Sequence, residues 1–173
     1  AGKRPRVVAV VLTKDEERHL PDCLKSLAWA DEVLVFDSFS GDRTVEIARQ
    51  MGARVAQRRF VDYPRQRQAA LEAAGGDWVF FVDADERVTP ELAEEIRFLL
   101  SSRPACDGYA LRRRNFLLGY KVRYSGWGTT TILRLIRRDP CRYREGWVHE
   151  EMLVPGGKVG TLSGKLAHHS CTD

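Results

Sequence analysis

The sequence predicts an α/β fold in which a doubly wound, mostly parallel sheet carries a small antiparallel extension. Over the first two-thirds of the chain, apolar β-branched segments alternate with amphipathic helical segments, as in parallel sheets covered on both faces. Polar and acidic residues gather where these strands end, which is the edge at which such sheets bind ligands. From about residue 102 onward, glycine- and arginine-rich connections separate short strand-like segments with little helix, which indicates antiparallel pairing.

The expected elements follow from the spacing of apolar residues. In chain order they are strand Val7–Leu12, helix Thr13–Leu27, strand Glu32–Phe36, helix Ser40–Met51, strand Arg54–Ala56, helix Arg65–Ala74, strand Trp78–Val82, helix Pro90–Leu100, and strands Gly108–Arg113, Thr131–Ile136 and Met152–Val154. Gly52 is expected to end the second helix, and Gly75 and Gly76 the third. Thr89 is expected to cap the fourth helix, with Pro90 at its first position.

Composition is typical of a soluble globular protein, with 43% hydrophobic and 30% charged residues among 173, a length that predicts one domain. The net charge is +4, and the arginines of the second half suggest an anionic partner, with a solvated basic face as the alternative. Four cysteines without metal-ligand spacing indicate reduced thiols in a cytosolic setting. No segment approaches the length of a membrane span, so any membrane association is expected to be peripheral.

The most informative segment is the apolar strand Trp78–Val82, which is followed by Asp83, Asp85 and Glu86. Because side chains alternate along a strand, Asp83 and Asp85 are expected to share a side. Two carboxylates at a strand end can hold a hard divalent cation such as Mn²⁺ or Mg²⁺, which keeps coordination positions for substrate phosphates. The segment therefore predicts a metal-bridged diphosphate site for a nucleotide-activated substrate, with a solvated acidic loop as the alternative.

The first two strands also end in polar residues. Asp37 follows the second strand and could accept a hydrogen bond from a nucleobase N–H or a ribose hydroxyl. Thr13 and Asp15 follow the first strand, and we expect them to line the same nucleotide site. The alternative for Thr13 is a capping box with Glu16 at the start of a helix.

Two further segments carry charged side chains suited to a transfer reaction. Arg65 and Arg67 lie in the first turn of an expected helix, where cations oppose the helix dipole, so a nearby diphosphate would account for them; a solvated surface is the alternative. Glu150, with His149 and Glu151 beside it, is the expected general base for a sugar hydroxyl.

Seven segments carry a family resemblance when they are taken together. They are Leu12–Glu17, Phe36–Thr44, Arg65–Leu71, Trp78–Glu86, Leu133–Leu135, Val148–Glu150 and Leu166–His168. In this order they resemble family 2 glycosyltransferases with the GT-A fold. Within that family, the chain is similar to bacterial enzymes of the lipopolysaccharide core, the β-1,4-glucosyltransferase type.

The resemblance implies a role for each donor-site residue. Thr13, Asp15 and Asp37 would hold uracil and ribose, and Arg67 would lie near the base or the phosphates. Asp83 would sit by the ribose and the metal. Residues 1–101 would then form the nucleotide-sugar-binding half of a single catalytic domain, residues 1–173, and residues 102–173 its acceptor-binding half.

The resemblance also implies the metal ligands and the catalytic base. Asp85 would bind the metal through the diphosphate, His168 would be a further ligand, and Glu150 would deprotonate the acceptor hydroxyl. The expected acceptor-binding residues are Trp127, Trp147, His149 and Arg134. Such enzymes invert the anomeric centre in one displacement while the metal neutralises the departing diphosphate. Residues 128–130 read Gly-Thr-Thr where this branch has a Tyr-Pro-Asp type stretch, which leaves the acceptor open.

The expected function is metal-dependent transfer of a sugar from a nucleotide-diphospho-sugar, with UDP as the expected nucleotide, to a glycolipid or polysaccharide precursor such as lipopolysaccharide core. The expected location is the cytoplasm, at the inner face of the cell membrane. Transfer to a polyprenyl phosphate and a nucleotide-sugar-binding module without turnover are the alternatives. Nucleic acid is not an expected partner, because the aromatic residues are not interleaved with the arginines in an RNA-binding pattern.

Overall fold

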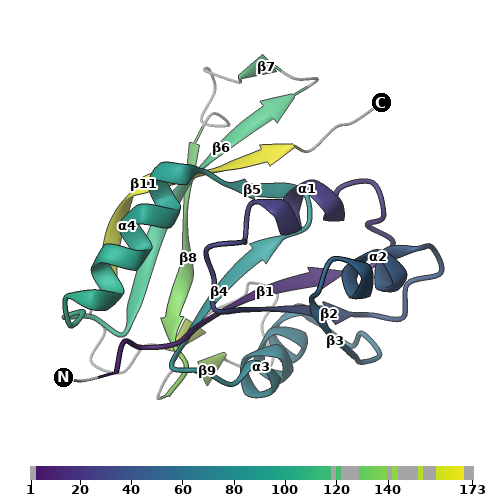
Figure 1. The fold of residues 1–173 in the computed structure, drawn as a ribbon, viewed down its shortest axis with the longest axis horizontal. Helices are drawn as coiled ribbons and strands as arrows, with labels where there is room; N and C mark the ends of the chain where they lie inside the picture. The colour runs from purple at the N-terminus through teal and green to yellow at the C-terminus, as the bar shows by residue number, and fades with distance from the viewer. Residues whose placement is uncertain are drawn as a thin grey trace.

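The computed structural model describes residues 3–117, 120–121, 129–139, 142–143, 152–153 and 159–169. In chain order its elements are β1 (Val7–Thr13), α1 (Leu20–Lys25), β2 (Glu32–Asp37), α2 (Thr44–Gln50), β3 (Arg54–Gln57), α3 (Tyr63–Ala74), β4 (Trp78–Asp83), β5 (Glu86–Val88), α4 (Pro90–Ser101), β6 (Gly108–Leu117), β7 (Tyr120–Lys121), β8 (Thr129–Arg137), β9 (Arg142–Tyr143), β10 (Met152–Leu153) and β11 (Val159–His169) (Figure 1).

One sheet contains nine of these strands, in the order β3-β2-β1-β4-β8-β6-β11-β5, with β7 paired to β6. The strands β3, β2, β1 and β4 are parallel neighbours, whereas β8 pairs antiparallel with both β4 and β6. The strand β11 then runs parallel to β6 and antiparallel to β5. This confirms the predicted fold class, a mostly parallel α/β sheet with an antiparallel extension.

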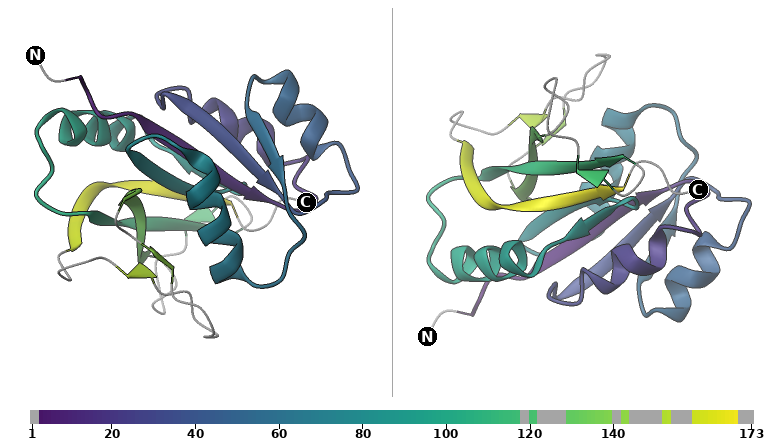
Figure 2. Two further views of the ribbon diagram at one scale, coloured as in Figure 1. Left: turned by 90° about the horizontal axis from the view of Figure 1, so that it is seen from below. Right: turned by 90° about the horizontal axis from the view of Figure 1, so that it is seen from above.

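Helices cover both faces of the sheet, and Figure 2 shows the sheet edge-on between them. Alternate residues of β1 divide between two cores because successive side chains point to opposite faces. Ala9 and Val11 pack in one core with apolar residues of α1, α2 and α4, whereas Val8 and Val10 pack in the other with α3. The strand β4 is buried along nearly its whole length, as expected for a central strand with both faces covered.

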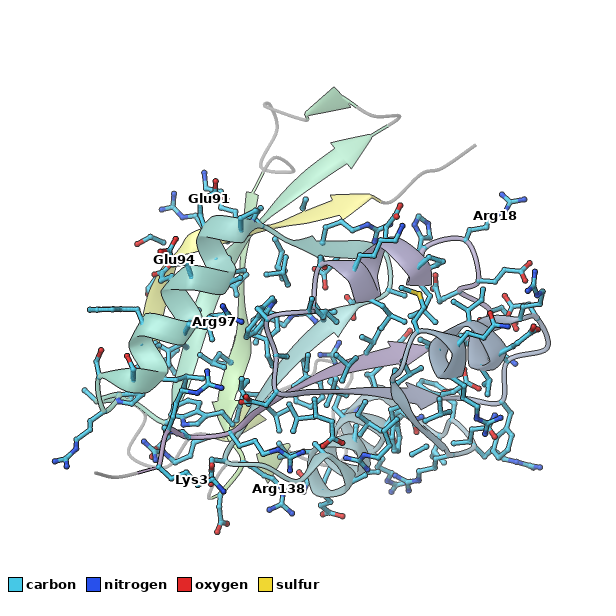
Figure 3. The ribbon with its side chains drawn as sticks, viewed as in Figure 1. Lys3, Arg18, Glu91, Glu94, Arg97 and Arg138 are labelled. Atoms are coloured by element: carbon cyan, nitrogen blue, oxygen red, sulfur yellow. The ribbon has the colours of Figure 1, made fainter. Side chains whose placement is uncertain are left out.

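The helix α4 packs against β11 through its buried face, while Glu91 and Glu94 project outward from it (Figure 3). The pairing of β11 with β6 is irregular between Thr161 and Lys165. At this irregularity the two carboxylate oxygens of Glu95 on α4 accept hydrogen bonds from the backbone N–H groups of Ser163 and Gly164, both at 2.7 Å. A carboxylate from the covering helix therefore satisfies backbone donors of the irregular strand.

Several of the expected boundaries are confirmed by particular contacts. Gly52 and Gly75 adopt positive φ angles of 84° and 69° at the ends of α2 and α3, a conformation that glycine reaches without steric cost. The hydroxyl of Thr89 accepts a hydrogen bond from the backbone N–H of Leu92 at 3.3 Å, and Pro90 begins α4.

Two expectations about the elements are wrong. The expected helix Thr13–Leu27 shortens to α1, because Thr13 continues β1 and residues 14–19 form a turn-rich connection. The capping box of Thr13 with Glu16 is therefore absent: the hydroxyl of Thr13 donates to Asp37 at 2.6 Å, and the backbone N–H of Glu16 donates to the hydroxyl of Thr44 at 2.9 Å. The strands β5 and β11 were not expected from the sequence. In the part of the chain that the structure describes, no helix is long and apolar enough to cross a membrane.

Candidate active site

A cavity of about 620 Å³ opens at the carboxyl ends of β1, β2 and β4. Its lining residues come from the ends of β1 and β4, from four connections and from α3: Leu12, Thr13, Lys14, Glu16, Ser38, Phe60, Tyr63, Gln66, Arg67, Asp83, Ala84 and Asp85. The volume lies within the range of about 300 to 1,000 Å³ that small-molecule sites occupy. This cavity therefore lies at the predicted ligand-binding edge of the sheet.

Asp37 connects several segments at this edge of the sheet through its hydrogen bonds. It is fully buried at the end of β2, and its carboxylate accepts hydrogen bonds from the hydroxyls of Thr13 at 2.6 Å and Ser40 at 2.5 Å, and from the amide of Gln57 at 3.1 Å. Burial acts to raise the pKa of Asp37, but the hydrogen bonds from Ser40 and Thr13 outweigh it and lower that pKa below its ordinary value. Asp37 is thus an ionised acceptor that joins β1 to the loop after β2, and its contact with a nucleotide stays a prediction.

Asp15 lies in the connection after β1, with a positive φ of 54°. Its side chain is half exposed, and its carboxylate accepts a hydrogen bond from the backbone N–H of Gly41 at 2.7 Å. Its own backbone N–H donates to the hydroxyl of Ser40 at 2.9 Å. Asp15 therefore ties two loops together at the same edge, whereas Thr13 lines the cavity itself; the predicted role of Asp15 in binding ribose stays a prediction.

Glu16 is a cavity residue that the sequence analysis did not assign to the site. Burial and the negative charges of Asp85 and Asp83 raise the pKa of its carboxyl group above the ordinary value. These three carboxyl groups therefore concentrate negative charge on one side of the cavity, which favours a cation there.

Asp83 makes contacts through both its backbone and its side chain. Its backbone N–H donates to the buried carboxylate of Glu86 at 2.7 Å, and its carbonyl oxygen accepts from the thiol of Cys23 at 3.6 Å. Its side chain lies 3.2 Å from a guanidinium nitrogen of Arg134 and 3.8 Å from one of Arg67. Asp83 is thus fixed in position at the end of β4, with two cations beside it.

Arg134 and Arg67 are both largely buried rather than on an open surface. Arg134 on β8 is 5% exposed and also reaches Glu86, at 3.6 Å. Arg67 on α3 is nearly buried, lines the cavity, and lies 5.9 Å from the centre of the ring of Phe81. Arg67, in the second turn of α3, faces Asp83 within the protein, whereas Arg65 in the first turn lies 3.6 Å from Asp62. The predicted contact of Arg134 with an acceptor stays a prediction.

Asp85 lies at the cavity, as expected, but strand alternation is not the reason. The strand β4 ends at Asp83, and Ala84 and Asp85 form the turn to β5, so strand alternation does not set their relative orientation. Asp83 and Asp85 nevertheless both line the cavity.

The carboxylates around this turn suit a hard cation whose remaining ligands come from the substrate. Among the described residues, no three His, Cys, Asp or Glu side chains are grouped closely enough to hold a metal by themselves. Mg²⁺ is usually bound by one or two carboxylates together with substrate phosphates, so Asp83 and Asp85 fit such an ion without a third ligand from the protein. The backbone of His168 pairs with Glu86, which brings that residue beside the turn of Asp85, and its ligand role stays a prediction.

The remaining predicted site residues are not placed by the structure. Trp127, Trp147, His149 and Glu150 lie outside the described residues. Two arginines of the second half are engaged within the protein: Arg137 pairs with Asp107 at 2.7 Å, and Arg138 donates to the carbonyl of Leu71 at 3.3 Å, beside α3 (Figure 3).

Phe60 and Tyr63 are cavity residues that sequence reasoning missed. They flank the connection between β3 and the start of α3, and their rings pack edge to face with centroids 5.0 Å apart. The available signal was two aromatic residues in a short polar connection at the carboxyl end of a strand, which is the edge that carries the other site residues.

Comparison with known proteins gives a family and a set of folds. Residues 8–150 match the family model described as "Glycosyl transferase family 2". The chain is 33% identical over 166 residues to the lipopolysaccharide core biosynthesis glycosyltransferase LpsC of Rhizobium meliloti, covering 92% of this chain and 62% of that protein. The chain therefore spans less than two-thirds of the length of this relative.

Two solved structures extend the comparison to the fold. TarS of S. aureus, residues 1–349 in complex with UDP-GlcNAc, is 26% identical with a TM-score of 0.56, covering 69% of this chain and 37% of that one. The mannosyltransferase PcManGT of Pyrobaculum calidifontis, in complex with GDP-Man and Mn²⁺, is 25% identical with a TM-score of 0.51, covering 63% of this chain and 35% of that one. Similarity to these transferases confirms the GT-A fold predicted for the chain.

Proposed function

Since the chain belongs to glycosyl transferase family 2, we propose that it transfers a sugar, with inversion, from a UDP-sugar to a glycolipid or polysaccharide-precursor acceptor with the help of a divalent metal ion. The cavity at the carboxyl edge of the sheet is the donor site. The observation that carries the proposal is the pair Asp83 and Asp85 on the lining of that cavity. This is the edge at which open α/β sheets bind their ligands.

The protein's own residues supply a prepared environment for a nucleoside diphosphate. Asp83 is fixed by Glu86 and Arg134, so it needs little rearrangement when a ligand arrives. Arg67 lines the cavity within reach of the phosphates that would lie beside Asp83, and a guanidinium group is well suited to bind phosphate oxygens. Thr13 and Ser38 line the same cavity and are the residues proposed to lie beside ribose and base.

The metal site is proposed at Asp85, with Asp83 beside it and His168 as a further ligand. A Mn²⁺ or Mg²⁺ ion there would neutralise the charge of the departing diphosphate. The carboxyl groups of Asp83 and Asp85 line the cavity, and Glu16 lies close enough to interact with both, so carboxylate oxygens are available there for such a cation. PcManGT, which has a similar fold, was solved in complex with GDP-Man and Mn²⁺, and this supports the assignment.

Acceptor binding and deprotonation are assigned to the second half of the chain. Glu150 is the proposed general base, and Trp127, Trp147, His149 and Arg134 are the proposed acceptor-binding residues. The similarity to LpsC supports lipopolysaccharide core as the acceptor class. Such an acceptor would place the protein at the inner face of the cell membrane, with peripheral contact to it.

The test is a transfer assay with UDP-sugars, Mn²⁺ and a lipopolysaccharide-core acceptor, in which Asp85→Asn is compared with Asp22→Asn. Asp22 lies on α1 with an exposed side chain and does not line the cavity, which makes its variant a matched control. We expect Asp85→Asn to abolish transfer and Asp22→Asn to retain it. Undiminished transfer by Asp85→Asn would refute the assignment of the metal site.

A further inference from the structure

The two aromatic residues at the cavity are unusually exposed for their size. Phe60 is 45% and Tyr63 is 58% exposed, although aromatic side chains of this size contribute strongly to cores when they are buried. Their rings contact each other edge to face, at an angle of 73°, an arrangement that aromatic pairs favour. Both residues line the cavity, which makes them an apolar wall of an otherwise polar site.

The aromatic wall and the two aspartates adjoin different strands of the sheet. Phe60 lies in the connection after β3 and Tyr63 begins α3, whereas Asp83 ends β4 and Asp85 follows it, and β2 and β1 lie between β3 and β4. Three strand spacings of about 4.8 Å separate β3 from β4 by roughly 14 Å. A nucleoside diphosphate likewise carries its planar base and its charged phosphates at opposite ends, with the ribose between them.

Polar groups lie between the two ends of the cavity. The side chain of Gln66 is almost completely buried, and its amide donates a hydrogen bond to the hydroxyl of Ser38 at 3.1 Å. Both residues line the cavity, so hydrogen-bonding groups stand beside the aromatic wall, where the edge of a planar ring would lie.

We propose that Phe60 and Tyr63 form a stacking wall for the nucleobase of the donor, at the end of the cavity remote from Asp83 and Asp85. The inference rests on the proposed function, because it assigns one part of the donor to one part of the same cavity. Stacking on an aromatic face is available to every base, so the wall contributes affinity, and base-edge hydrogen bonds must provide selectivity.

The same connection carries exposed Arg58 and Arg59, and basic side chains beside aromatic ones are also typical of protein surfaces that bind anionic membranes. The cavity favours the nucleobase. Phe60 and Tyr63 line it, while Val61, which is exposed on the same connection, does not. Membrane contact therefore becomes an outcome that the experiment must separate.

The experiment is isothermal titration of the full chain with UDP and with inorganic pyrophosphate, each in the presence of Mn²⁺. Since rings inclined at 73° cannot both lie parallel to one planar base, we expect at least one of Phe60→Ala and Tyr63→Ala to raise the Kd for UDP, by about 5- to 150-fold, the effect of removing a stacking partner. The Kd for pyrophosphate, which has no base, should stay unchanged. Tyr63→Phe, which retains the ring, and Phe98→Ala, which removes an exposed ring on α4, should both bind UDP as the wild type does.

Three results would overturn the inference. Wild-type affinity for UDP in both alanine variants overturns the stacking wall while leaving the donor site in place. A wild-type chain that binds neither UDP nor pyrophosphate overturns the proposed function and the inference with it. Sedimentation with phosphatidylglycerol vesicles that is lost in the alanine variants, while their affinity for UDP is unchanged, overturns the inference and assigns the aromatic pair to a membrane surface.

Discussion

Replacing Arg134 by methionine probes the buried charges beneath the cavity. Arg134 is 5% exposed, Glu86 is fully buried, and a guanidinium nitrogen lies 3.2 Å from Asp83 and 3.6 Å from Glu86. Removing one partner of a buried ion pair costs about 3–5 kcal/mol, because the other charge stays buried without compensation. Since Arg67 still faces Asp83 at 3.8 Å, we expect Arg134→Met to lower the free energy of unfolding by about 3 kcal/mol, at the lower end of that range.

Urea denaturation followed by circular dichroism measures this change, and thermal unfolding should show a decrease in Tm of roughly 6–12 °C for a chain of this length. The double variant Arg134→Met/Glu86→Gln removes the buried negative charge as well. It should be more stable than Arg134→Met by about 1 kcal/mol or more, because a glutamine oxygen can still accept from the backbone N–H of Asp83.

Lys25→Met is the matched control, since Lys25 and Asp22 form an exposed pair at 3.9 Å whose loss should cost less than about 1 kcal/mol. A cost for Arg134→Met as small as that of the control would refute the reasoning. A double variant that is less stable than the single variant would refute it independently.

Three further predictions concern pH and packing. Hydrogen bonds lower the pKa of Asp37 in the folded chain, so its contribution to stability is present above its ordinary pKa of 3.8 and is lost as pH falls through the folded-state pKa. In urea denaturation, the difference in free energy of unfolding between wild type and Asp37→Asn should therefore become smaller in acid. A difference that does not change with pH would contradict this. The pKa of Glu16 is raised in the folded chain, so its ionised form destabilises the fold above the folded-state pKa, and this destabilisation vanishes below the ordinary pKa of 4.5. Glu16→Gln should therefore be more stable than wild type at neutral pH and equally stable in acid. Lower stability of Glu16→Gln at neutral pH would argue against the charge repulsion. A Cβ atom at Gly164 would lie 2.7 Å from the Cα atom of Leu92, so Gly164→Ala should cost about 1–3 kcal/mol in chemical denaturation; a neutral effect would show that α4 does not approach β11 this closely.

The parallel half of the fold was predictable because its signals are local. The strand Trp78–Val82 is continuously apolar and ends in carboxylates, and Gly52 and Thr89 mark helix boundaries through their own backbone and side-chain chemistry. The strand β11 was missed because Gly160 and Gly164 interrupt its pattern of apolar residues. Its irregular backbone also depends on Glu95 of α4, a helix that is distant in sequence but packed against it. Its existence follows from packing between segments about 70 residues apart, which no local window contains.

The candidate site divides in the same way. The strand-end positions of Thr13 and Asp83 placed them at the cavity from sequence alone. The ion pairs of Asp83 with Arg134 and Arg67 could not be predicted, because they join the end of β4 to a covering helix and to a residue of β8 that is 51 positions later in the chain. Phe60 was missed because an aromatic residue in a connection is informative only once the cavity beside it is known.

The most direct test of the donor site is thermal unfolding of the wild type and of Asp85→Ala with UDP, GDP, CDP and dTDP, each with and without Mn²⁺. A ligand that binds only the folded chain raises Tm by mass action, so no acceptor is needed. We expect UDP to raise the Tm of the wild type only when Mn²⁺ is present, and we expect this increase to disappear in Asp85→Ala. An unchanged Tm with every nucleotide, or an increase that Asp85→Ala retains in full, would contradict it.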